Sequence, residues 1–93
     1  MAPGLPNGYS NLNSDQVMMS GSAVQLTDAL ASEVVLTALK ANTAALYVGG
    51  EGVTSGSGLE IAPGNSVTLH VGHVGMLWAV GTAGDKLSFA AAY

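Results

Sequence analysis

Hydrophobic and polar positions alternate in short runs from about residue 24 to the C-terminus. In the run 32–40, one face holds Val34, Leu36 and Ala38, and the other holds Val35, Thr37 and Leu39. Both faces are apolar and several of these residues are β-branched, so the pattern predicts a central strand that is covered on both sides. A helix over 26–40 is the competing interpretation, because the segment 28–33 tolerates a helix.

Further short strands are predicted at 44–49, 59–61, 66–71, 76–80 and 86–92, each bounded by turn residues. The segment 62–65 fits a type II turn, because Pro63 presets φ at the second position and Gly64 allows positive φ at the third. The residues expected to be buried are Val34, Leu36, Leu46, Val48, Ile61, Val67, Leu69, Val80, Leu87 and Phe89. Six or seven short strands at this spacing predict an all-β fold, a small antiparallel β-sandwich or barrel.

The N-terminal segment 1–16 differs from the rest of the chain. It is rich in Pro, Gly, Asn and Ser, and Pro3 and Pro6 prevent a continuous helix. We therefore expect an extended arm over 1–16 and a β-sandwich domain over 17–93. The arm is either a disordered tail or a segment that orders against a neighbouring protein. Because the N-terminus lacks a basic region followed by an apolar one, we expect no signal peptide.

The composition is poor in charge. Charged residues make up 9 % of the 93 residues, against about 25 % in typical soluble domains, and two lysines face six acidic residues for a net charge of −4. This balance argues against nucleic-acid binding and against a basic membrane-binding helix. The absence of cysteine excludes disulfides and thiolate chemistry. With so few charges, either Ser, Thr, Asn and Gly keep the surface hydrated, or other subunits cover part of it.

The sequence offers little for catalysis, cofactors or metals. His70 and His73 are three residues apart, which on a strand places them on opposite faces. The glycine-rich segments 49–52 and 56–58 match neither the dinucleotide-binding nor the P-loop pattern, and no serine lies in a nucleophile elbow. We therefore expect no catalytic, cofactor-binding or metal-binding residues, and a protein that is not an enzyme.

Three residues are candidate interface contacts. Trp78 is out of phase with Leu77, so it is either a core residue of a sheet covered on both faces or a contact anchor, since Trp is enriched at interfaces. Met18 and Met19 lie where the arm joins the domain, and methionine packs adaptably against partners. An exposed aromatic platform would have to come from Tyr9, Tyr47, Trp78, Phe89 and Tyr93, which alternation alone does not group.

Three sequence blocks resemble a small β-domain that recurs in accessory virion proteins of tailed bacteriophages. They are the run from Leu36 to Thr43, LYVGGEGVTSGSG at 46–58, and LEIAPGNSVTL at 59–69. The likeness extends over about residues 24–90, and its motifs form turns and loops. It implies a structural virion protein, with a capsid decoration (cement) protein on the outer head surface as the expected function. The alternative is a tail or fibre component with contact to a host surface.

The resemblance also implies partners and a location. The expected partners are the major capsid protein and other copies of the chain, arranged as a homotrimer, with no nucleic acid and no membrane. The protein would be made in the host cytoplasm and would act in the virion. A chain with a pI near 4.6 suits the outer face of the head, because an inner face lies against packed DNA.

Overall fold

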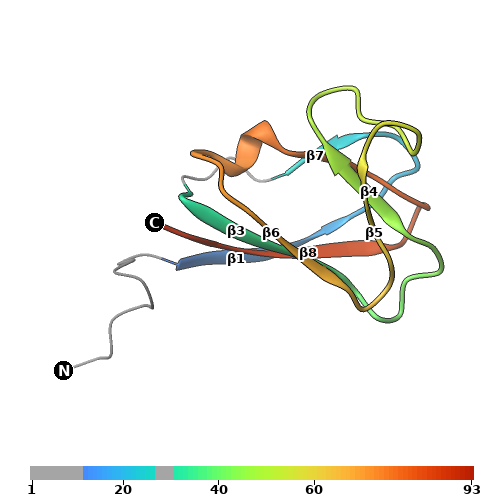
Figure 1. Cartoon of the computed structure of the whole chain (residues 1–93). Helices are drawn as coiled ribbons and strands as arrows, with labels where there is room; N and C mark the ends of the chain where they lie inside the picture. The colour runs from blue at the N-terminus through green and yellow to red at the C-terminus, as the bar shows by residue number, and fades with distance from the viewer. Residues whose placement is uncertain (1–11, 27–30) are drawn as a thin grey trace.

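The described part of the chain folds into two antiparallel four-stranded sheets, which form a β-sandwich (Figure 1). The computed structural model describes residues 12–26 and 31–93. Sheet A has the strand order β1-β8-β3-β6, and sheet B has the order β2-β7-β4-β5. The predicted all-β sandwich is confirmed, and the described residues form more strands than the six or seven expected.

The sheet A strands are β1 (Leu12–Met18), β3 (Glu33–Ala38), β6 (Ser66–Leu69) and β8 (Lys86–Ala92). The sheet B strands are β2 (Val24–Gln25), β4 (Leu46–Gly49), β5 (Leu59–Ile61) and β7 (Trp78–Val80). A short 3₁₀ helix, η2 (Val74–Met76), leads into β7. The structure therefore corrects the strand that we expected to begin at residue 76.

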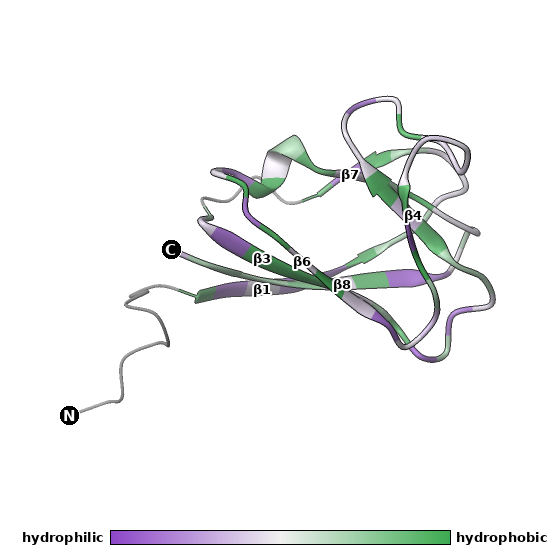
Figure 2. Cartoon of the chain, viewed as in Figure 1, coloured by the Kyte–Doolittle hydropathy of each residue, from purple (hydrophilic) through white to green (hydrophobic). Residues whose placement is uncertain are grey.

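The core lies between the sheets and comes from every second residue of the facing strands. The central strands β3 and β8 both have strictly alternating burial, with Val34 and Leu36 opposite Ala91 and Phe89 in register. Sheet B contributes Leu46, Val48, Ile61 and Ala79 from the other side. Figure 2 shows hydrophobic segments mainly on the strands, while hydrophilic segments fall largely in connections and at strand ends.

Seven of the ten expected core residues are buried, and the other three, Val67, Leu69 and Val80, are half-buried. Val67 and Leu69 lie on the edge strand β6, where sheet B covers them only partly. Val80 points to the outer face of sheet B, because Ala79 is the inward residue of β7. The 3₁₀ turn places Leu77 and Ala79 toward the core and reverses the expected facing of Val80.

The turn at 62–65 has the predicted geometry. Gly64 adopts φ +84°, and the Asn65 amide donates to the Ala62 carbonyl oxygen at 2.9 Å. In addition, the Gly64 amide donates to the Ala38 carbonyl oxygen at 2.8 Å, which ties the turn to the end of β3. The turn thus fixes the register in which β6 pairs with β3.

Strand β1 begins at Leu12, inside the range that we assigned to the N-terminal arm. Its residues Leu12 to Met18 pair in register with β8 from Ala92 to Lys86. The β-domain therefore includes residues 12–16, and the rest of the expected arm, residues 1–11, lies outside the described residues.

Candidate functional site

The outer face of sheet A has two cross-strand rows without a charged side chain. Register places one residue from each strand in each row. The first row is Ser14, Ala90, Val35 and Thr68, and the second is Gln16, Ser88, Thr37 and Ser66. We call these eight residues the A-face. Their uncharged and mostly small side chains leave a hollow of about 330 Å³ over β1, β8 and β3, into which side chains of another protein can reach.

The A-face is flanked by larger groups at both strand ends. Leu12 and Met18, both 60 % exposed, lie on the same side of β1 as the A-face residues Ser14 and Gln16. At the Leu12 end, His70 Nε2 lies 3.3 Å from Glu33 Oε2. At the other end, Lys86 pairs with Met18. The uncharged rows are thus bordered by apolar and charged groups.

Within the A-face, neighbouring hydroxyl groups satisfy one another. Thr37 Oγ1 and Ser66 Oγ are 2.7 Å apart, and Ser88 Oγ donates to the Thr37 carbonyl oxygen at 3.5 Å. These contacts hold the polar atoms of the second row close to the sheet. A partner can therefore cover the row without leaving these hydroxyls unpaired.

The sequence pattern of β3 predicted cover on both faces, and the described residues provide it on one face only. Val34, Leu36 and Ala38 are buried in the core, whereas Val35 and Thr37 are half-buried on the A-face. The expectation of a strand covered on both sides is thus corrected for the described part of the chain. An apolar strand pattern on an uncovered face is typical of an interaction surface.

The outer face of sheet B is partly closed by the chain itself. The loop between β4 and β5 folds back over it, and Val53 is 7 % exposed there. A Cβ on Gly49 would lie 2.9 Å from Val53 Cγ2, and a Cβ on Gly58 would lie 2.8 Å from both Val53 Cγ2 and Tyr47 Cβ. Both glycines are therefore needed so that the loop can lie against the sheet.

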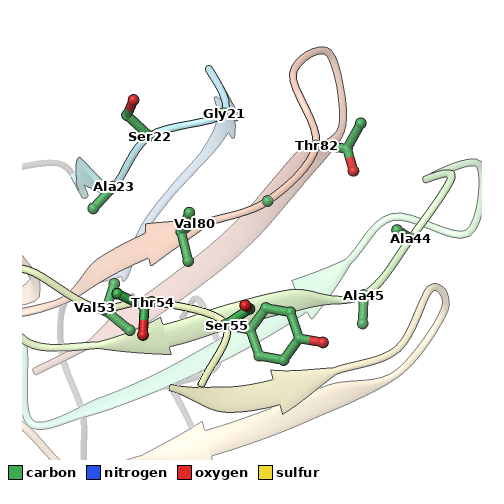
Figure 3. A pocket seen from close by; sticks show the side chains of 12 residues that line it. Gly21, Ser22, Ala23, Ala44, Ala45, Val53, Thr54, Ser55, Val80 and Thr82 are labelled. Atoms are coloured by element: carbon green, nitrogen blue, oxygen red, sulfur yellow. The ribbon is translucent and has the colours of Figure 1, made fainter. Parts of the chain in front are cut away.

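Beside this loop the outer face of sheet B retains a groove of about 630 Å³. Figure 3 shows Val80 between the segment at Ser22 and Ala23 and the loop at Val53 to Ser55. Tyr47 and Thr82 also line the groove. None of the described residues that line it carries a charge.

The three candidate interface residues have different environments. Met18 is exposed beside the A-face, as an interface residue would be. Met19 is 1 % exposed and belongs to the core, so the expectation that it contacts a partner is corrected. Trp78 is half-buried on the outer face of sheet B, where register places it opposite Gly49 and Gln25.

Register also groups two aromatic residues that alternation did not. Tyr47 pairs with Val80, and Gly49, two residues further along β4, pairs with Trp78, so Tyr47 and Trp78 share the outer face of sheet B. Phe89 is 2 % exposed in the core, Tyr93 is exposed at the C-terminus, and Tyr9 lies outside the described residues. The grouping was missed because it depends on pairing between distant strands.

Side-chain hydrogen bonds hold the turn at Asn42 and Thr43, which lies in one of the sequence blocks named above. We call the hydrogen bonds of Asn42 and Asp85 at this turn the latch. Asn42 Nδ2 donates to the Lys86 carbonyl oxygen at 2.7 Å, and Asn42 Oδ1 accepts from the Lys86 amide at 2.8 Å. The Asp85 carboxylate, 6 % exposed, accepts from the Thr43 amide and hydroxyl and from the Ala44 amide. The latch fastens the β3–β4 turn to the start of β8.

These contacts set the charge state of Asp85. The Thr43 amide bond is the main cause that lowers the pKa of the Asp85 carboxyl, with the Thr43 hydroxyl and the Ala44 amide acting in the same direction. Desolvation opposes them by raising the pKa. Alternation along the chain does not reveal this role of Asp85, because its partners lie more than 40 residues away in sequence.

The histidines have local partners. His70 lies beside Glu33, and His73 Nδ1 accepts from the Gly75 amide at 3.2 Å, which caps η2. Among residues 12–26 and 31–93, no three His, Asp or Glu side chains are grouped so that they could hold a metal ion. Over the same residues, the chain has no helix that is long and apolar enough to cross a membrane.

Comparisons with known proteins give one structural similarity. No family model matches the chain, and no curated protein matches it. A chain from Bacillus endospore appendages, described as a novel family of disulfide-linked pili, is similar at 17 % identity and a TM-score of 0.44. The match covers 99 % of this chain and 97 % of that chain. The present chain contains no cysteine.

Proposed function

We propose that the protein is a structural component of a tailed-bacteriophage virion, a capsid decoration (cement) protein on the outer surface of the head. In this proposal it binds the major capsid protein and further copies of itself as a homotrimer. It catalyses no reaction and binds neither nucleic acid nor membrane. The protein would be made in the host cytoplasm. The observation that carries the proposal is the A-face, an uncharged sheet surface that no described part of the chain covers.

The dimensions of the A-face favour a contact that acts in many copies. Four strands about 4.8 Å apart, on each of which the two rows take up about four residues at 3.3 Å, give roughly 250 Å² of sheet. A stable isolated complex buries about 800 Å² per partner, so this face alone gives a weak contact. Weak contacts become effective when copies are linked, because the second contact then forms at a high local concentration. Attachment as a trimer to a repeating shell meets this requirement.

The free edges of sheet A support self-association. The Met19 amide bonds to the Asp85 carbonyl oxygen, and alternation along β1 then directs the Gln16 amide to the free edge. The Asp15 carboxylate already accepts from this amide at 2.7 Å, which blocks the middle of the β1 edge. The β6 edge has no charged side chain within Ser66–Leu69. This edge is therefore our candidate contact between copies of the trimer.

The distribution of charge supports an orientation on the head. Glu60 lies on the outer face of sheet B, and Glu51 lies in the loop that covers this face. If the A-face lies against the shell, these carboxylates point to solvent, away from the shell and the packed DNA. The protein would then stabilise the head without chemistry, because a ligand that binds only the closed shell favours that state.

The test is the heat stability of purified heads with and without the protein. Decorated heads are expected to retain their DNA to a higher temperature than stripped heads, and added protein should restore the difference. Equal temperatures for DNA release would contradict the cement function. A density map of the intact particle locates the chain independently, and density on the tail alone would also contradict it.

A tail or fibre component is the second candidate function. It is favoured by Tyr47 and Trp78, which share the outer face of sheet B and are both half-buried there. Aromatic side chains on one face are typical of surfaces that contact a partner. The same density map separates the two candidates, because it shows whether the chain lies on the head or on the tail.

A further inference from the structure

We propose that the groove on sheet B binds a neutral oligosaccharide of two or three sugar units. The groove is distinct from the A-face and lies on the opposite sheet, so this inference does not rest on the capsid contact. Its volume of about 630 Å³ falls within the range of about 300–1,000 Å³ that is typical of small-molecule sites. The floor includes Val80, and the Tyr47 ring contributes an aromatic surface.

The groove is lined by hydroxyl groups, and three of them have no hydrogen-bond partner among the described residues. Ser55 and Thr82 are exposed, Tyr47 is half-buried, and all three line the groove. Within the parts of the chain that the structure describes, their hydroxyl groups make no hydrogen bond, whereas Thr54 Oγ1 is already bonded to Ser57 and Gly56. Hydroxyls both donate and accept, which matches the hydroxyl groups of a sugar.

The charges of the groove select against an anionic ligand. No described lining residue is charged, and Glu60 lies opposite Tyr47 in register, so the closest carboxylate by register would repel an acidic sugar. Glu60 would attract a cationic ligand, but no carboxylate among the lining residues could pair with its charge inside the groove. A neutral ligand therefore fits the electrostatics of this surface best.

The sheet topology disfavours an extended peptide as the occupant. A peptide that binds by strand addition needs a free sheet edge. The groove lies over β4 and β7, and each of these strands is already paired on both sides, β4 with β5 and β7, and β7 with β2 and β4. Tyr47 and Val80, the strand residues of the groove, pair with each other between these two central strands, so a peptide cannot be added as a further strand there.

The proposal can be tested by NMR titration of the isotope-labelled full chain. The probes are maltotriose and cellotriose, with trigalacturonic acid as the charged control and a neutral Gly-Ser pentapeptide as the alternative occupant. We expect a neutral trisaccharide to shift the amides of Ala23, Ser55, Thr82 and their neighbours in a saturable way. Trigalacturonic acid and the pentapeptide should leave these amides unchanged.

Variants then test the named hydroxyls. The double variant Ser55→Ala/Thr82→Val should weaken binding about 25-fold, since each lost hydrogen bond is worth about fivefold in affinity. The control Ser32→Ala removes an exposed hydroxyl just before β3, outside both the groove and the A-face, and should bind like the parent chain. The inference is overturned if neither neutral trisaccharide shifts the groove amides, if the pentapeptide shifts them instead, or if the control variant loses affinity equally.

Discussion

The outer faces of the two sheets differ in whether a loop of the described chain covers them. On sheet B, the β4–β5 loop lies across the strands, buries Val53 and leaves a defined groove beside it. On sheet A, two rows of small uncharged residues remain without such a loop among the described residues. The apolar pattern of β3 nevertheless resembles that of a strand with two covered faces. One face is thus partly covered within the chain, and our proposal is that a partner covers the other.

The largest effect on stability is expected from opening the covered face of sheet B. Gly58→Ala places a methyl group 2.8 Å from Tyr47 Cβ and Val53 Cγ2, so the loop must lift from the sheet. We expect the free energy of unfolding to fall by about 3 kcal/mol. The measurement is urea unfolding.

Gly56→Ala is the matched control in the same loop. Its added methyl would meet only Thr54 Oγ1, at 3.8 Å, so its stability should stay within about 0.5 kcal/mol of the parent chain. If Gly58→Ala were as stable as Gly56→Ala, the loop would not be packed on sheet B as described.

A smaller loss in the free energy of unfolding is expected when the latch between the β3–β4 turn and the start of β8 is removed. Asn42→Ala leaves the Lys86 amide and carbonyl without their side-chain partners. The free energy of unfolding should fall by about 2 kcal/mol, because the lost hydrogen bonds are partly shielded from water. Asn65→Ala, at an exposed turn position, serves as the control and should be nearly neutral. Equal stability of both variants would rule out the latch.

The latch also predicts a dependence on pH. The pKa of Asp85 is lower in the folded protein than in the unfolded chain, so its ionised form stabilises the fold. This contribution is present above about pH 4 and is lost as the pH falls through the folded pKa. Urea unfolding across the acidic range should show a steeper loss for the parent chain than for Asp85→Asn. Parallel curves for the two proteins would contradict this role of Asp85.

Alternation along single strands predicted much of the fold. It identified β3, β4, β5, β6 and β8 and most of their inward residues, because these strands each have one face against the core. It missed β1, whose sequence LNSDQVM is mostly polar, because this edge strand is held by backbone pairing with β8. It misassigned Val80 because η2 lies immediately before β7, and no alternating pattern marks that change.

The candidate sites were less predictable than the fold. Alternation showed that Val35 and Thr37 lie on a second apolar face, but not that this face stays uncovered in a single chain. The pairing that brings Tyr47 and Trp78 to one face joins strands about 30 residues apart in sequence, so it requires the register of sheet B. Met18 and Met19 are neighbours, and only the pairing of β1 shows that the first is exposed and the second buried.

The smallest effect on folding is expected on the A-face itself. Ala90 is half-buried in the first row, and a lysine at this position can extend into solvent when no partner is present. Ala90→Lys should therefore unfold within about 0.5 kcal/mol of the parent chain. A loss comparable to that of Gly58→Ala would show that the A-face is packed within the single chain, and the contrast between the two sheets would fail.

The proposal that a partner covers the A-face, but not the outer face of sheet B, is tested most directly by how much Ala90→Lys binds to heads stripped of the protein. A partner that covers the A-face would bury the new ammonium group without a counter-charge, so binding should weaken at least about thirtyfold. Ala83→Lys makes the same change at an exposed turn position and should bind like the parent chain. Loss of binding by Ala90→Lys alone is the predicted result. Equal occupancy of both variants would contradict the assignment of the A-face as the contact surface.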